Sequence, residues 1–194
     1  VPADGAANVD MPESERARLA AAWAAAHYFV TLGRKEWLFC TGLTAPEIER
    51  QVMADRYLFI TAWNPPPGET PRADNDAAQA RLEARVQALG LSLHPALGCD
   101  NRGGMVEYGC LVLDATLAQA DALAREFGQG GTLCWSTGEP VRLRMMWPRP
   151  SEAPPSAGGR VPPCATTACR PGRAPVPGPR AAPCLLLPSE AAAE

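Results

Sequence analysis

The chain of 194 residues carries 18 Lys and Arg against 21 Asp and Glu, a formal net charge of -3, and 46% hydrophobic residues. This length predicts a single domain with a sizeable core, and the composition excludes a collagen, a coiled coil and a disulfide-dense miniprotein. The mildly acidic balance argues against nucleic-acid binding through a basic surface.

Proline is concentrated at one end of the chain. Ten of the 21 prolines fall within residues 151–194, a segment that has no aromatic residue. So few large apolar side chains cannot offset the entropy of ordering the chain. We therefore expect a disordered Pro/Ala/Gly-rich tail over 149–194, a single domain over 12–148, and a flexible extension over 1–11 with Met11 as the true start.

The first part of the domain predicts a helix, a hairpin and a second helix. Residues 12 to about 30 place an apolar stripe at helical spacing, at Leu19, Trp23, Ala26 and Val30. The runs 28–32 and 36–40 flank a glycine-containing turn, which indicates a hairpin that starts before the helix has fully ended. Thr44 and Glu47 have the spacing of a capping box, which predicts a short helix with Ile48 and Val52 inward.

A buried strand and a long helix come next. The run 57–63 (YLFITAW) is nearly continuously apolar, as in a central strand, and Asn64 and three prolines stop it. Asp74 or Asn75 is then expected to cap a helix that ends at Gly90. Residues 91–97 alternate between apolar and polar, which is typical of a more exposed strand.

The remaining elements complete a recognisable order. Residues 105–113 form a strand with a buried end, and Thr116 and Gln119 open a helix that stops at Gly128. Residues 132–135 and 141–146 read as a closing hairpin. The order β-α-β-β-α-β predicts a ferredoxin-like α+β core, with residues 12–56 as an N-terminal helix-hairpin-helix elaboration and one extra C-terminal strand.

Several motifs resemble a bacterial family known as domain of unknown function 3293. The run 59–65 (FITAWNP) is the most specific, followed in order by Asn75, Glu107 and the A-x-x-L-A-x-x-F-G-Q pattern over 120–129. The resemblance covers roughly residues 15–147. The chain departs from it at Pro66-Pro67 and at Gly130-Gly131. The resemblance implies a fold unit and assigns no catalytic role.

The same motifs supply the first candidate ligand-binding residues, which are Thr61, Trp63 and Asn64 of the FITAWNP run and Asn75. Asn64 follows the first central strand and Asn75 opens the next helix, where free helix N–H groups can attract an anion. The structural alternative is that Asn64 shapes a turn before proline and Asn75 caps the helix.

Glu107 and Gln129 are the other two candidates. We expect both at the end of the sheet opposite Asn64 and Asn75, which disfavours a single four-residue site. A buried carboxylate needs a partner, and Arg142 or Arg144 would supply an ion pair for Glu107. The structural alternative for Gln129 is a helix cap or a hydrogen bond that ties down a loop.

Other chemistry has little support in the sequence. His27 and His94 stand in no nucleophile signature, and the seven cysteines lack metal-ligand spacing, which favours reduced thiols and neither a metal nor a cofactor. The glycine-rich run 98–104 joins two strands and matches no phosphate-binding motif, so we expect a hairpin turn.

We therefore expect a small cytoplasmic protein, monomeric or homodimeric, that binds a small molecule or a protein partner without catalysis, nucleic acid or membrane. Three alternatives stay open. The first is an enzyme, hydrolytic or nucleotide-directed, that uses Asn64, Asn75 or Glu107. The second is an RNA- or DNA-binding module. The third is an interaction module with an exposed apolar patch or sheet edge near Trp135 or Trp147.

Overall fold

The computed structural model describes residues 11–66 and 69–146. The expected extension up to residue 10 and the expected tail from 149 lie outside these residues. The predicted mixed α+β class is confirmed. In chain order the elements are α1 (Glu13–Ala25), β1 (His27–Leu32), β2 (Lys35–Phe39), α2 (Pro46–Gln51), β3 (Arg56–Thr61), α3 (Arg72–Ala88), β4 (Leu93–Cys99), β5 (Glu107–Leu113), α4 (Leu117–Glu126), β6 (Gly131–Ser136) and β7 (Arg142–Met145).

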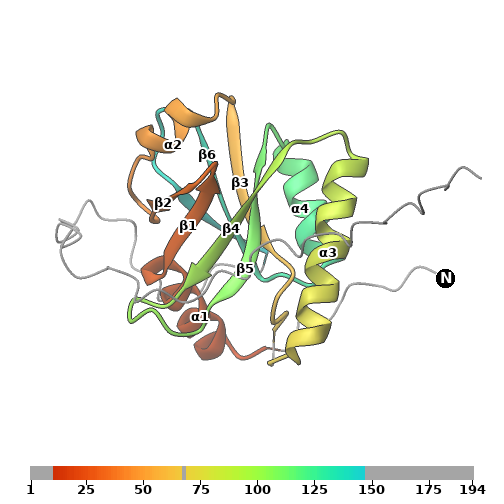
Figure 1. The fold of residues 1–194 in the computed structure, drawn as a ribbon. Coiled ribbons are helices and arrows are strands. Elements are labelled where there is room, and N and C mark those ends of the chain that lie inside the picture. Colours follow the sequence, from red (N-terminus) through yellow and green to blue (C-terminus); the bar gives the residue numbers. More distant parts are fainter. Residues whose placement is uncertain (1–10, 67–68, 147–194) are drawn as a thin grey trace, which may run out of the picture. The chain divides into compact units, whose positions relative to one another are not determined.

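The described strands form one antiparallel sheet in the order β2-β1-β4-β5-β3-β6-β7. Helices α3 and α4 cover one face of it (Figure 1). Alternate residues of β3 and β5, such as Leu58 and Val112, pack there against Leu82 of α3 and Leu123 of α4. These side chains are almost completely buried, so the two helices and the two central strands share one core.

The opposite face of the sheet curls around a second, aromatic core. The ring centroids of Phe39 in β2 and Trp135 in β6 are 5.4 Å apart, although these strands are far apart in the sheet order. Backbone hydrogen bonds join Val141, just before β7, to Gly42 (2.8 Å) and Leu43 (2.9 Å), just after β2. Helix α2 lies at one end of this curled face and α1 at the other (Figure 1).

Helix α1 is shorter than the sequence predicted. It ends at Ala25, and Ala26 is already extended. Val30, expected on the helical stripe, lies instead in β1 and is fully buried. The aromatic and β-branched residues of this segment pair with β2 on one side and β4 on the other, and these contacts outweigh the helical spacing.

Two of the predicted helix starts are wrong and one is confirmed. Helix α2 begins with Pro46 after Ala45, which has no side-chain acceptor, so Thr44 is not its cap. Helix α3 begins at Arg72, before both of its predicted caps. The Thr116–Gln119 capping box opens α4 as expected, with Gln119 N donating to Thr116 Oγ1 at 3.2 Å.

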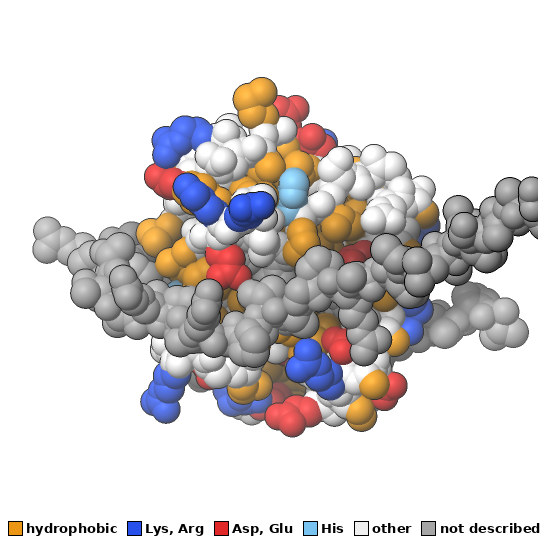
Figure 2. All heavy atoms as spheres, in the orientation of Figure 1, with side chains coloured by type: hydrophobic (Ala, Val, Ile, Leu, Met, Phe, Trp, Pro, Cys, Tyr) orange, Lys and Arg blue, Asp and Glu red, His pale blue; other side chains and the backbone are white. Residues whose placement is uncertain are grey.

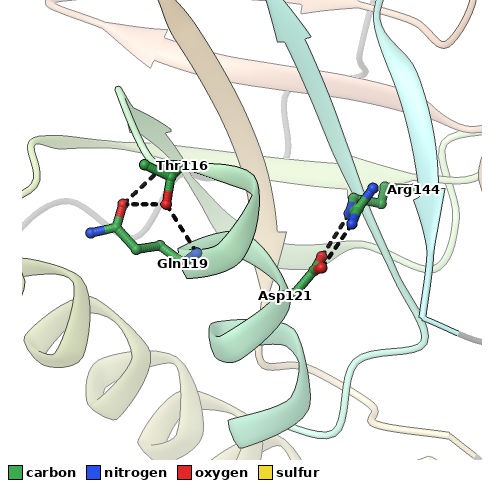
Figure 3. A network of polar contacts seen from close by, with 4 residues as sticks. All are labelled: Thr116, Gln119, Asp121 and Arg144. Atoms are coloured by element: carbon green, nitrogen blue, oxygen red, sulfur yellow. Dashed lines mark hydrogen bonds and ion pairs between the residues drawn. The ribbon is translucent and has the colours of Figure 1, made fainter.

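An ion pair attaches α4 to the last strand. Arg144 of β7 donates from Nε and Nη2 to the two carboxylate oxygens of Asp121 at 2.6 and 2.7 Å. Figure 3 shows this pair one turn along the helix from the capping box. The first half of α4 is therefore held by its own cap and, one turn later, by a charged contact from the sheet edge.

Candidate functional site

A network of hydrogen bonds lies at the end of β3, centred on Asn64. Asn64 N donates to Asn75 Oδ1 and Asn75 Nδ2 donates to Asn64 Oδ1, both at 2.9 Å. Thr70 joins them, because its N–H donates to Asn64 Oδ1 and its carbonyl accepts from Asn75 Nδ2, both at 3.0 Å. Asn75 is only 2% exposed and does not cap α3: its side chain clamps the loop after β3.

The backbone of Asn64 suits this central position. Its φ of 44° lies in the left-handed region, which asparagine tolerates better than most residues. The side-chain amide of Asn64 directs its oxygen toward Thr70 of the loop and its nitrogen toward Glu107 of the sheet. Asn64 does shape the turn before Pro65, and it also connects two elements through its side chain.

The expected separation of Glu107 from Asn64 is wrong. Asn64 Nδ2 donates to Glu107 Oε1 at 2.9 Å. The reason is that β3 and β5 are antiparallel, with Thr61 opposite Gly109, so the start of β5 lies beside the end of β3.

Gln129 reaches the same end of the sheet. It follows α4, which returns the chain from the far end of β5 to the start of β6, and it is buried. Its Nε2 donates to the carbonyl of Trp63 at 3.2 Å, which ties the loop after α4 to the loop after β3. The structure therefore brings Asn64, Asn75, Glu107 and Gln129 together.

Thr61 and Trp63 complete the set. Thr61 Oγ1 donates to the carbonyl of Tyr108 at 2.6 Å and accepts from the N–H of Trp63 at 2.9 Å. The indole of Trp63 packs edge-on against the ring of Tyr108, with centroids 5.1 Å apart, and its buried Nε1 has no hydrogen-bond partner among the described residues. All six candidate residues therefore lie around one end of β3.

The arginine partner expected for Glu107 is wrong. Arg144 pairs with Asp121, and Arg142 lies 3.7 Å from Glu139. Burial raises the pKa of the Glu107 carboxyl, and the hydrogen bond from Asn64 opposes that shift. Among the described residues only Oε1 accepts a hydrogen bond, which leaves Oε2 available to a ligand.

A cavity of about 420 Å³ adjoins this network, between α1 and the curled face of the sheet. Its polar lining includes four of the candidates: Thr61, Asn64, Glu107 and Gln129. Much of the remaining lining is apolar and comes from α1, β1, β3, β6 and β7, notably Leu19, Trp23, Tyr28, Phe59, Leu133 and Leu143. A smaller hollow of about 260 Å³ lies beside Asn64 and contacts Trp63, Asn75 and Tyr108.

The apolar wall of this cavity was not predicted from the sequence. Two glycines carried a usable signal, since a glycine inside a strand often marks a close approach. A Cβ on Gly98 of β4 would lie 3.1 Å from the ring of Tyr28, and one on Gly131 of β6 would lie 3.1 Å from the indole of Trp23. Both glycines let aromatic side chains lie against the sheet at the cavity.

Other potentially reactive groups lie in structural positions. His27 is in β1, and His94 is in β4, where burial lowers its pKa. The four described cysteines form no disulfide with one another, and burial raises the pKa of Cys110 to about 12. Within residues 11–66 and 69–146, no group of three or more His, Cys, Asp or Glu side chains could hold a metal ion.

Two further expectations were an exposed apolar patch near Trp135 or Trp147 and the absence of a membrane span. Trp135 is 4% exposed, stacks on Tyr57 and donates to Glu49 Oε1 at 3.2 Å, so its side chain is not part of an exposed apolar patch. Trp147 lies outside the described residues. In the part of the chain that the structure describes, no helix is long and apolar enough to cross a membrane.

Residues 60–131 match the model of a family described as "Protein of unknown function (DUF3293)". The suspected family is confirmed over this segment. The DUF3293 segment runs from within β3 to the first residue of β6 and contains all six candidate residues. Helix α1, which supplies part of the cavity wall, precedes it. No curated protein and no solved structure matches the chain.

Proposed function

We propose that this protein is a small-molecule-binding domain whose ligand occupies the cavity between α1 and the curled sheet. The observation that carries the proposal is Glu107, a half-buried carboxylate at the cavity with one oxygen held by Asn64 and the other without a hydrogen bond among the described residues. An oxygen that no described protein group occupies can accept a hydrogen bond from a ligand donor, and such hydrogen bonds are strong when the acceptor is ionised.

The dimensions of the cavity support the same function. Its volume of about 420 Å³ falls within the range of small-molecule sites. Such sites combine mostly apolar walls with a few fixed polar groups, and the network around Asn64 fixes its polar groups through the backbone of β3 and its following loop.

A substitution on α1 tests this proposal. Ala22 lines the cavity and Ala21, its neighbour, does not. We expect 2-phenylethanol, used as a neutral probe, to cause saturable chemical-shift changes at the amides of Gly98 and Glu107. Ala22→Trp should abolish these changes and Ala21→Trp should preserve them. Unchanged spectra of the native chain at millimolar probe, or equal binding by both variants, would contradict the proposal.

An enzyme is the second candidate, because a carboxyl with a raised pKa in a cavity is suited to proton transfer. Against it, the lining hydroxyl of Thr61 already donates to a backbone carbonyl, which leaves it poorly placed as a nucleophile. Release of p-nitrophenol from p-nitrophenyl esters or phosphates by the native chain, lost in Glu107→Gln, would favour this candidate over simple binding.

Nucleic-acid binding has less support. Ferredoxin-like RNA-binding modules stack bases on exposed aromatic residues of the sheet, whereas Tyr57, Phe59 and Trp135 on the curled face are buried. In the orientation of Figure 2, acidic and basic side chains are interspersed outside the grey region, without a continuous basic surface.

We also propose that β3 to β6, with α3 and α4, form a ferredoxin-like unit. In support, the strands lie in the order β4-β5-β3-β6, which places the first and third strands of the unit at its centre, and both helices contact one face. The preceding helix, hairpin and helix would then be an elaboration that extends the sheet through β1, and β7 would be the extra strand.

A further inference from the structure

The charged side chains that line the cavity are mostly acidic. Among its described lining residues, the side chains that are charged at neutral pH are one cation and four carboxylates: Arg18, Glu15, Glu69, Asp100 and Glu107. Arg18 is already engaged, because its Nε and Nη2 donate to the two oxygens of Glu15 at 2.9 and 2.6 Å. Among the described lining residues, no cation remains for the other three carboxylates.

Of those three carboxylates, Glu107 is the one placed to bind a ligand. Asp100 uses Oδ1 to accept the backbone N–H groups of Arg102 (3.0 Å) and Gly104 (2.7 Å), which shapes its own turn. Glu69 is exposed at the edge of the cavity. Glu107 is half-buried, fixed by Asn64, and close enough to Tyr28 to raise the pKa of its hydroxyl in addition to the effect of burial.

The apolar walls face the same space. Phe59 and Tyr28, with ring centroids 5.0 Å apart, and Leu133 form the floor on the sheet, and Trp23 contributes from α1. A ring or short alkyl chain placed there would be removed from water while one end of the ligand remained near Glu107.

We infer that the ligand is an amphipathic amine, whose protonated nitrogen pairs with Glu107 and whose apolar body packs against Phe59, Leu133 and Trp23. This inference rests on the proposed binding function. A cation compensates the cost of keeping a half-buried carboxylate ionised. An anionic ligand of the same shape would be repelled by three carboxylates that have no cationic partner in the described lining.

Three probes of similar shape test the inference: 2-phenylethylamine, 2-phenylethanol and 3-phenylpropionate, titrated by calorimetry near neutral pH. We expect the amine to bind about tenfold more tightly than the alcohol, as one charged hydrogen bond predicts, and the propionate to show no saturable binding. If none of the three binds, the proposed function itself is wrong. If the alcohol or the propionate binds as tightly as the amine, only the inferred ligand class is wrong.

Substitution of Glu107 localises the effect. Glu107→Gln keeps the acceptor for Asn64 but removes the charge, so its affinity for the amine should fall to about the level of the alcohol, roughly tenfold. Its affinity for the alcohol should stay unchanged, which also shows that the variant is folded. Glu36→Gln, at an exposed position of β2, is the matched control and should bind all three probes like the native chain. Full amine affinity in Glu107→Gln would overturn the assignment.

Discussion

The two asparagines around the end of β3 have different structural roles. Asn64 connects the loop after β3 to β5 through Glu107, and Asn75 holds the loop itself closed from inside α3. The preference of asparagine for turns and caps predicts where such residues occur along the chain. It does not predict that two of them pair with each other, because that pairing depends on how the loop folds back.

Asn75→Ala should lower the free energy of unfolding by about 1–3 kcal/mol, because it leaves the N–H of Asn64 and the carbonyl of Thr70 without these partners in a buried site. Urea denaturation measures the loss. Asp74→Ala, an exposed change in the same helical turn, is the control and should cost much less. Equal losses in the two variants would show that the buried amide is not a clamp.

Glu107 predicts a distinctive dependence of stability on pH. Burial raises its pKa in the folded chain above the ordinary value of 4.5, so the folded state holds this proton more tightly than the unfolded state does. This contribution to stability is fully present below pH 4.5 and is lost as pH rises through the raised pKa.

Relative to Glu107→Gln, the native chain should therefore lose stability as pH rises from 4.5 through the raised pKa of Glu107, as linkage requires. Urea denaturation of both proteins across this range gives the difference. Glu36→Gln should follow the native chain throughout. A difference between the native chain and Glu107→Gln that stays constant with pH would contradict the raised pKa.

At the scale of an element, α4 is attached to the sheet by a bidentate ion pair. Asp121 and Arg144 make two short hydrogen bonds, and Asp121 is more buried than the carboxylates of the other ion pairs in the described chain. A double-mutant cycle with Asp121→Asn and Arg144→Gln should give a coupling energy of about 1 kcal/mol. The same cycle on the exposed Glu139–Arg142 pair should give a value near zero.

The coupling should also depend on pH. The hydrogen bonds from Arg144 hold the pKa of Asp121 below its ordinary value of 3.8. Because the folded pKa is lowered, the contribution is present above pH 3.8 and is lost as pH falls through the folded value. A coupling that survives strong acid would show that the contact is not ionic.

At the scale of the whole molecule, aromatic contacts hold the curl of the sheet. Phe39 of β2 contacts Tyr28, Phe59 and Trp135, so it connects an edge strand to strands at the centre and at the far side. The hydrogen bonds between Val141 and the loop after β2 lie beside these contacts in the chain and join the same two ends of the sheet.

Phe39→Ala should therefore cost about 3–5 kcal/mol, the range for removing a buried aromatic side chain. Leu38, its neighbour on β2, is 44% exposed, and Leu38→Ala should cost far less. Chemical denaturation compares the two variants. A small loss in Phe39→Ala would mean that the backbone ladder alone maintains the curl.

The local pattern of the sequence predicted correctly those elements whose stabilising contacts are made between residues close together in the chain. The buried run that forms β3, the capping box of α4 and the resemblance to DUF3293, whose family model matches residues 60–131, could all be recognised from short segments. The local pattern was misleading where pairing with distant strands decides the secondary structure. Val30 has helical spacing, but it pairs with β2 and β4 and lies in a strand. The cap predicted at Thr44 failed because Pro46 begins the helix without needing one.

The sequence by itself determined the mixed class, the order of most elements and the six residues of the candidate site, because periodicity, caps and motifs act over short distances. Only the tertiary structure decided that these residues meet. Antiparallel pairing brings the start of β5 to the end of β3, and α4 returns Gln129 to the same end. The chain, a mildly acidic one overall, thereby places around one cavity three carboxylates that have no cationic partner among the described lining residues, because the fold gathers side chains that lie far apart in sequence.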